Sequence, residues 1–211
     1  EPFKSYEPKE IGDGWEISTP DNENINSDEL KNIFADFHND DNLWMVRSMT
    51  VLRNGKLIAE SYTKDEADRY EKRAVWSCTK QFIGILTGMA IEAGYIESLD
   101  DNLEKYFPEE CAKYPEKKNI TIGNLLMMQS GIDYTNWGIG GDDDQILRQN
   151  PDSYVDFIFE KPMADPPGTN YKYKDCDPHL LSEIIYRQTG KHTDEWADDV
   201  LFSKIGFTNY E

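Results

Sequence analysis

The chain has 211 residues, enough for one good-sized core or two small ones, and its 22 basic and 41 acidic side chains give a formal net charge of -19. Hydrophobic residues make up 38% and aromatic residues 12%, which fits a folded protein and excludes a disordered one. Because so acidic a chain repels phosphate backbones and no basic stripe interrupts it, we exclude nucleic acid as a partner. No apolar run reaches the roughly 18 residues of a membrane-spanning helix.

The N-terminal part predicts an extended lead-in, a helix and a hairpin. Residues 1–26 are polar and rich in Pro, Asn and Asp. Ser27 is the expected N-cap of an amphipathic helix, with apolar residues three and four positions apart up to Phe37. Residues 43–52 are β-rich, Asn54-Gly55 favours a tight type I′ turn, and residues 56–62 predict the returning strand.

The rest of the chain predicts helices. Residues 81–93 are apolar nearly all round, which is typical of a helix buried in a core, and Gly94 is placed to end it. Further helices are expected at residues 121–129, from Asn150-Pro151 to about 159, at 177–189, and from a Thr193 cap to about 203. Since a lone hairpin is marginally stable, we expect a missing C-terminal segment, or a second chain, to complete the sheet.

The chemistry is predicted at Ser77-Cys78-Thr79-Lys80. A hydroxyl and an amine three residues apart lie on one helical face, and a serine becomes a nucleophile once a base takes its proton. Burial and the helix dipole both lower the pKa of an amine at a helix N-terminus, which would suit Lys80 to that role. The backbone N–H of Ser77 is the expected donor to an oxyanion. The alternative is an N-cap serine beside an incidental lysine.

The same spacing occurs a second time, at Ser61-Tyr62-Thr63-Lys64. This copy ends a predicted strand and runs into a charged segment at residues 65–68, so we interpret it as a solvated strand end. The Ser77 copy instead opens a buried helix, which is the environment that the mechanism requires.

Residues 76–96, WSCTKQFIGILTGMAIEAGYI, resemble the nucleophile helix of the serine β-lactamase and penicillin-binding family, closest to its class C β-lactamase and family VIII esterase branch. Residues 98–108, 120–133 and 167–181 resemble further segments in the family's order. The resemblance implies an α+β fold of the β-lactamase/DD-peptidase type, with an antiparallel sheet flanked by helices, a mainly helical subdomain, and C-terminal strands missing from this chain.

The same resemblance suggests four parts of the chain. The N-terminal lead-in covers residues 1–26, and the start of the α/β domain, with hairpin and nucleophile helix, covers 27–99. A mainly helical subdomain follows at 100–195, and residues 196–211 return towards the α/β domain, where the chain is truncated.

The family's second motif, Tyr-x-Asn, corresponds to Tyr173-Lys174-Asp175, which implies that Tyr173 shuttles protons. The unperturbed pKa of a phenol is about 10, and the amine of Lys80 would lower it. Asp175 replaces the usual Asn; an ionised carboxylate only accepts hydrogen bonds and could hold Lys80 charged. The resemblance also implies that Asp175, Lys174 and Trp137 contact the substrate. The alternative is that Tyr173 only packs a loop.

The family's third motif, Lys-Thr-Gly or His-x-Gly, is absent from this sequence. We therefore expect a serine acyl hydrolase that forms an acyl-enzyme on Ser77, acts on small-molecule esters or amides and needs no metal or organic cofactor. A β-lactamase or D-alanyl-D-alanine peptidase is one alternative, and a non-catalytic ligand-binding or sensor protein is another. The implied location is extracytoplasmic: periplasmic, secreted or lipid-anchored, with the export signal outside this chain.

Several residues are not assigned to the site. The three histidines are interpreted as structural or surface residues, and residues 142–144 as a solvated loop tip. Cys78 and Cys176 flank the two motifs and could form a disulfide, although buried free thiols are favoured. Trp76 either lines the cleft or belongs to the core.

Overall fold

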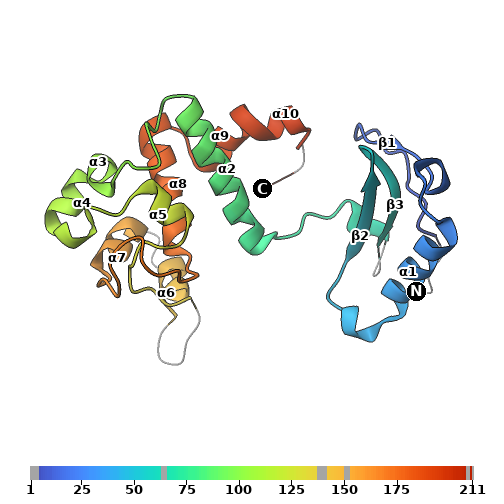
Figure 1. Cartoon of the computed structure of the whole chain (residues 1–211), viewed down its shortest axis with the longest axis horizontal. Helices are drawn as coiled ribbons and strands as arrows, with labels where there is room; N and C mark the ends of the chain where they lie inside the picture. Colours follow the sequence, from blue (N-terminus) through green and yellow to red (C-terminus); the bar gives the residue numbers. More distant parts are fainter. Residues whose placement is uncertain (1–4, 63–65, 137–141, 150–152, 208–209, 211) are drawn as a thin grey trace. The chain divides into compact units, whose positions relative to one another are not determined.

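The structure is a computed structural model that describes residues 5–62, 66–136, 142–149, 153–207 and 210. The chain divides into two compact units, Glu1–Ala74 with Gly206–Glu211, and Val75–Ile205 (Figure 1). The four-part scheme with boundaries at 26, 99 and 195 is a division of another kind and stays a prediction.

The first unit holds a three-stranded sheet in the order β1-β3-β2. Strands β2 (Ser48–Arg53) and β3 (Lys56–Tyr62) pair antiparallel, and β1 (Glu16–Ile17) pairs parallel with β3. Asn54 and Gly55 have φ angles of 52° and 78°, as a type I′ turn requires, so the hairpin prediction is confirmed. Residues 43–47 were wrongly predicted as strand, since a 3-10 turn precedes the start of β2.

Helix α1 (Ser27–Asn39) covers this sheet. Its N-cap is Asn26, one residue before the expected Ser27, because the Asn26 side chain accepts hydrogen bonds from the N–H groups of Asp28 and Glu29. The buried side of the helix packs on the centre of β3 in a small core of Leu30, Phe34, Ile58 and Ala59.

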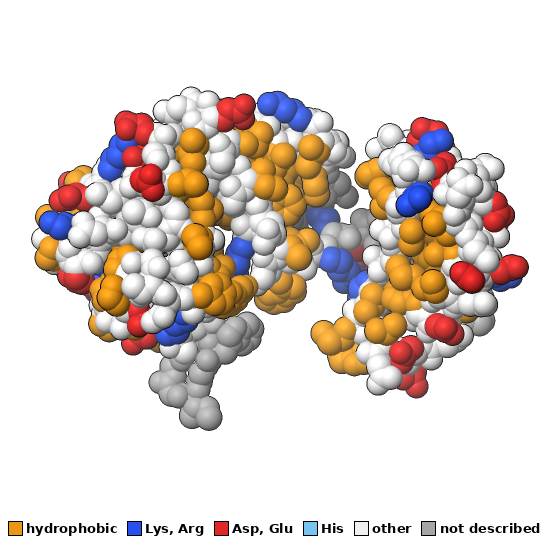
Figure 2. All heavy atoms as spheres, in the orientation of Figure 1, with side chains coloured by type: hydrophobic (Ala, Val, Ile, Leu, Met, Phe, Trp, Pro, Cys, Tyr) orange, Lys and Arg blue, Asp and Glu red, His pale blue; other side chains and the backbone are white. Residues whose placement is uncertain are grey.

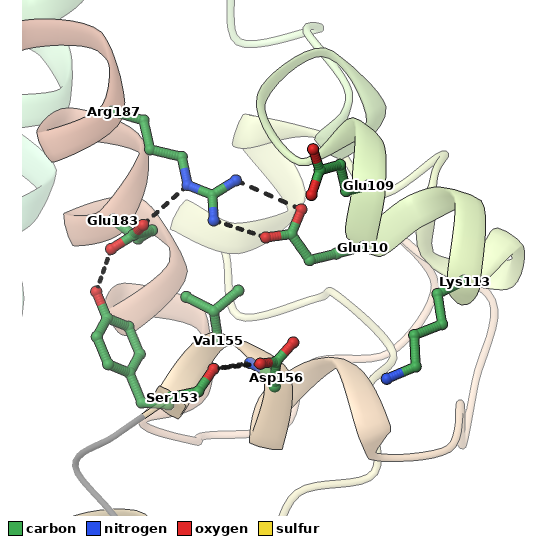
Figure 3. A pocket seen from close by; sticks show the side chains of 9 residues that line it. Glu109, Glu110, Lys113, Ser153, Val155, Asp156, Glu183 and Arg187 are labelled. Carbon is green, nitrogen blue, oxygen red and sulfur yellow. Dashed lines mark hydrogen bonds and ion pairs between the residues drawn. The ribbon is translucent and has the colours of Figure 1, made fainter.

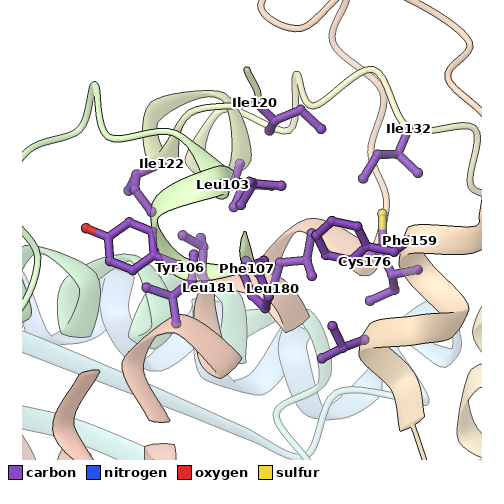
Figure 4. Close-up of a cluster of buried hydrophobic side chains, with 14 of the residues drawn as sticks. Leu103, Tyr106, Phe107, Ile120, Ile122, Ile132, Phe159, Cys176, Leu180 and Leu181 are labelled. Atoms are coloured by element: carbon purple, nitrogen blue, oxygen red, sulfur yellow. The ribbon is translucent and has the colours of Figure 1, made fainter. Parts of the chain in front are cut away.

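The second unit is helical and is organised around α2 (Thr79–Glu92) and α8 (Cys176–Thr189), which pack against each other. Shorter helices complete it: α3 (Leu103–Tyr106), α4 (Pro108–Lys113), α5 (Ile122–Leu126), α6 (Asp143–Gln149), α7 (Tyr154–Glu160), α9 (Thr193–Ala197) and α10 (Ser203–Ile205). Figure 4 shows its main core, where apolar side chains of α3, α5, α7 and α8 converge, among them Leu103, Phe107, Ile122, Phe159 and Leu180.

The nucleophile helix is less buried than its apolar sequence predicts. Ile83, Leu86 and Ala90 of α2 are buried, whereas Ile85 of the same helix is 49% exposed. Gly94, with a φ of 79°, follows the helix as expected and takes the left-handed conformation that glycine tolerates.

One expectation about the helical unit lies outside the described residues, and another needs correction. The expected start of α7 at Asn150-Pro151 lies outside the described residues, and the observed N-cap is Ser153, whose hydroxyl accepts from the N–H of Asp156. Residues 142–144 are not a solvated loop tip, because Asp143 begins α6 and its carboxylate pairs with Lys161 at 2.5 Å.

The loop that leads into α8 lies against residues 128–133. Gly131 makes this close approach possible: its carbonyl accepts the N–H of Ala164 at 2.8 Å, and its φ is +78°. A Cβ at this position would lie 2.1 Å from the carbonyl oxygen of Asp165. Both the backbone conformation and the missing side chain therefore require glycine.

Replacing Gly131 with Ala should destabilise the second unit by about 3 kcal/mol, because a left-handed alanine and a backbone clash add their costs. The expected fall in Tm is roughly 6–12 °C by calorimetry. Gly88→Ala is the matched control: it lies inside α2 with open space at its Cβ, and alanine should stabilise the helix slightly. Equal Tm values for the two variants would contradict the role of Gly131.

Neither a membrane-spanning helix nor a metal centre is found among the described residues. Among the residues described, no helix is both long and apolar enough to cross a bilayer. Within the same ranges, no three His, Cys, Asp or Glu side chains are grouped to hold a metal ion. Figure 2 shows Asp and Glu side chains scattered over both units on the face in view.

Candidate active site

The candidate nucleophile lies where the chain enters α2. A 3-10 turn over Trp76–Cys78 carries Ser77 and leads directly into the helix. Trp76 has a φ of 47°, a conformation that a bulky side chain adopts only at a cost. Such backbone strain is typical of functional sites, where the surrounding structure holds it in place.

The structure brings Ser77, Lys80 and Tyr173 together. The hydroxyls of Tyr173 and Ser77 lie 2.6 Å apart, although the residues are 96 positions apart in the chain. The Nζ of Lys80 donates to the Ser77 Oγ at 3.2 Å and lies 5.0 Å from the centre of the Tyr173 ring. The serine oxygen therefore has two proton-carrying groups within hydrogen-bond reach.

Asp175 completes the group as the counterion of Lys80. Its carboxylate lies 2.5 Å from the Lys80 Nζ. Burial disfavours the charge of Lys80, but its hydrogen bonds to Asp175 and Tyr173 outweigh burial and raise the pKa of Lys80. Burial likewise disfavours the Asp175 carboxylate, yet the Lys80 hydrogen bond lowers the pKa of Asp175. The expectation that burial and the helix dipole would lower the pKa of Lys80 is therefore not met. The direction agrees instead with the other expectation, that Asp175 holds Lys80 charged.

Further groups hold Asp175 in place. Its backbone N–H donates to the Asn136 Oδ1 at 2.9 Å. Asp144, which lines the same hollow, accepts from the Arg148 Nε at 2.8 Å. A chain of polar contacts thus runs from Ser77 through Lys80 and Asp175 to Asn136.

A hollow of about 380 Å³ opens beside these residues. It is lined by Trp76, Ser77, Thr79, Lys80, Ile83, Asp144, Arg148, Asp175, Pro178, His179 and Ser182. Sequence reasoning missed Asp144, Arg148 and His179. His179 follows Asp175 by four positions, and its Nδ1 donates to the Asp175 carbonyl at 2.7 Å. That helical spacing from the second motif was the one available signal.

Other predicted site residues lie elsewhere. Lys174 does not line the hollow: its side chain points into the core and donates to the carbonyl of Ile132 at 3.1 Å. Trp137 lies outside the described residues. Cys78 is exposed, whereas Cys176 is buried as expected, and both thiols are free.

The second Ser-x-x-Lys copy is not the solvated strand end that the sequence predicts. Ser61 is buried in β3, and its Oγ lies 2.6 Å from the Nε2 of His38. The partner lysine of this copy lies outside the described residues. Residues on both faces of β3 are buried. The polar residues that follow the strand in the sequence do not indicate this burial.

A larger hollow of about 630 Å³ lies between α4, α7 and α8 (Figure 3). Its charged groups mostly satisfy one another: Arg187 pairs with Glu110 and Glu183, and Glu183 accepts from the Tyr154 hydroxyl at 2.5 Å. Its serine, Ser153, caps α7. We therefore place the chemistry in the smaller hollow, which contains Ser77.

The fold is that of the β-lactamase/DD-peptidase class. The model of the family described as Beta-lactamase matches residues 47–211, and the chain belongs to that family. A search of curated proteins gave no match.

Solved structures show the same fold at low sequence identity. A protein of Bacillus anthracis, provisionally described as a 6-aminohexanoate-dimer hydrolase, has a TM-score of 0.64 and 23% identity over 76% of this chain and 44% of its own. FmtA from Staphylococcus aureus has a TM-score of 0.61 and 18% identity, over 93% of this chain and 52% of its own. A penicillin-binding protein from Bacillus halodurans has a TM-score of 0.59 and 21% identity, over 76% of this chain and 52% of its own. The chain thus spans about half the length of these structures.

Replacing Asp175 with Asn should lower the pKa of Lys80, because burial would then act without the opposing carboxylate. With its raised pKa, Lys80 of the wild type keeps its charge further into the alkaline range than Lys80 of D175N. In D175N the charge, and with it the reactivity of Ser77, should be lost at lower pH. The measurement is the rate of Ser77 labelling by a fluorophosphonate between pH 7 and 10.

Asp133→Asn is the control for this measurement. Asp133 forms an exposed ion pair with Lys172, which lies on the same loop as Asp175. Its replacement should leave the pH at which the labelling rate falls unchanged. If the labelling rate of D175N falls at the same alkaline pH as that of the wild type, Asp175 does not set the charge of Lys80.

Proposed function

We propose that this protein is a serine-dependent acyl hydrolase that forms an acyl-enzyme on Ser77. The observation that carries the proposal is the 2.6 Å contact between the hydroxyls of Ser77 and Tyr173, with the Lys80 ammonium beside both. A nucleophile, a base within hydrogen-bond reach and a third group that orients the base are the parts that such catalysis requires.

Tyr173 acts as the base in this proposal. Lys80 is held charged by Asp175, so it does not take the serine proton. In this proposal Tyr173 reacts as the phenolate, after its own proton has gone to solvent, and takes the proton of Ser77 as the Ser77 Oγ bonds to the substrate carbonyl carbon. Tyr173 returns that proton to the leaving alcohol or amine, and a water molecule, deprotonated in the same way, then releases the acid from Ser77.

The developing oxyanion needs donors. The backbone N–H of Ser77 supplies one, since it lies in the first turn before α2. A strand carrying the family's third motif supplies the second, and in this proposal it comes from a C-terminal segment or a second chain that completes the sheet. That segment is also where Lys-Thr-Gly or His-x-Gly would stand.

Esters and small amides are the proposed substrates. A carboxylate at position 175 cannot donate to an amide carbonyl, whereas an ester is hydrolysed without that donor. The relatives of known structure carry names of an amide hydrolase and of a penicillin-binding protein, so a β-lactamase or D-alanyl-D-alanine peptidase is the second candidate. A binding or sensor protein on the same fold is the candidate from another class. The proposed location is extracytoplasmic.

The full-length protein should be incubated with a fluorophosphonate and, separately, with a penicillin, and the adducts mapped by peptide mass spectrometry. The expected result is labelling of the Ser77 peptide by the fluorophosphonate and not by the penicillin. Ser77→Ala should abolish this labelling. Ser61→Ala is the matched control, since Ser61 belongs to the first unit and should retain full labelling of Ser77.

The other outcomes separate the candidates. Labelling by the penicillin would favour the β-lactamase or peptidase. A folded full-length protein that neither reagent labels would rule out the hydrolase and favour the binding protein.

Tyr173→Phe removes the proposed base and keeps the ring that packs beside Lys80. It should lower kcat for an aryl ester by roughly 10²–10⁴-fold, the usual effect of losing a general base. Steady-state kinetics would show this with KM little changed. Tyr171→Phe, an exposed tyrosine of the same loop, is the control and should keep the wild-type kcat.

A further inference from the structure

A second ion pair is buried directly behind the candidate site. Lys174 is 1% exposed and Asp177 is fully buried, and the Lys174 Nζ lies 4.0 Å from the Asp177 Oδ2. Well-packed apolar side chains would often fill such a space at equal or lower free energy. A contribution to stability is therefore a poor explanation for this pair.

Lys174 and Asp177 connect the loop before α8 and the first turn of α8 to residues 130–132. Lys174 donates to the carbonyl of Ile132 at 3.1 Å. Asp177, in the first turn of α8, accepts from the Ser130 hydroxyl at 2.7 Å. Ser130 and Ile132 flank Gly131, where the chain already approaches the loop closely. Loop, helix and segment are thus joined at buried polar contacts.

In the sequence, Lys174 lies between Tyr173, which contacts Ser77, and Asp175, which pairs with Lys80. Lys174 is 1% exposed, whereas its neighbour Tyr173 is 41% exposed and contacts the Ser77 hydroxyl. Because the two residues share one stretch of backbone, fixing the Lys174 side chain in the core also restricts where Tyr173 can lie.

We propose that Lys174 and Asp177 are positioning residues that hold Tyr173 at hydrogen-bond distance from Ser77. Neither touches the serine, and both act through the loop. The inference rests on the proposed function, because Tyr173 is taken as the base.

Acid weakens this anchor. Burial raises the pKa of Asp177 to about 6, against the opposing effects of Lys174 and of the Ser130 hydrogen bond. The other titratable group facing this carboxylate is the buried thiol of Cys176 on α8. As the pH falls through about 6, the folded protein protonates Asp177, while the unfolded chain does so only near 3.8. The Lys174 ammonium then faces a neutral acid, and kcat should fall.

The experiment compares four variants of the full-length protein: K174M, D177N, the double variant K174M/D177N, and K172M as the matched control. Lys172 lies on the same loop in an exposed ion pair. The readouts are kcat and KM for an aryl ester between pH 5 and 8, together with Tm. Each single variant leaves one buried group without its partner, so kcat at pH 7 should fall tenfold or more with KM changed less than twofold.

The double variant removes both charges. It should recover kcat to within about threefold of the wild type and lack the acid limb near pH 6, whereas K172M should behave as the wild type. Single variants that lower Tm but keep the wild-type kcat and acid limb would overturn the proposal. A double variant no better than the worse single variant would overturn it too, because the two residues would then not act as a pair.

Failure of the proposed function would look different. A folded wild type without turnover or Ser77 labelling would reject the hydrolase, and the positioning role is then read from the ¹³C resonance of the Tyr173 ring, assigned with Y173F. That resonance should shift near pH 6 in the wild type and not in the double variant. A resonance that does not shift in the wild type would overturn the positioning role.

Discussion

The packing of α2 against α8 is the constraint on which the candidate site depends. Ile83 and Leu86 of α2 and Leu181 and Ile185 of α8 are buried in the two core clusters of the second unit. Ser77 precedes the first helix by one turn, and Asp175 is the residue before the second. Packing the two helices therefore brings their N-terminal ends to one place, where the positive ends of both dipoles favour negative charge. A carboxylate and a developing oxyanion are the charges that such a place stabilises.

In the proposed mechanism, the charge of Lys80 determines which residue acts as the base. In this mechanism Asp175 holds Lys80 charged, so Tyr173 and not Lys80 takes the serine proton. Asp175 then has an electrostatic role in place of the donor that an asparagine would supply. Its backbone N–H bond to the Asn136 side chain holds this part of the chain in place.

Sequence reasoning reached the residues whose relation is local or whose segments follow a known order. Ser77 and Lys80 are joined by helical spacing, and Tyr173 was found because its segment resembles the family's second motif. The hairpin and the glycine end of α2 were predicted because turn chemistry is local. The raised pKa of Lys80 depends on a carboxylate far away in the chain, which helical spacing does not reveal and which only the resemblance to the second motif suggested.

The missed features share this cause. The contacts of Asp144 and Arg148 with the site depend on how α6 lies against it, which no spacing encodes. The burial of Ser61 depends on both faces of β3 being covered, and Lys174 seemed a site residue because its neighbours are. Lys174 points into the core, where Asp177 and the Ile132 carbonyl are its partners. The sequence alone does not show that the loop and α8 bring these groups together.

All four groups that contact one another around Ser77 lie within the second unit, Val75–Ile205. Preparation of the nucleophile is therefore a property of that unit's own packing. In the proposed mechanism, the groups that deprotonate the serine and the first oxyanion donor therefore belong to one unit, and only the second oxyanion donor has to come from another part of the protein.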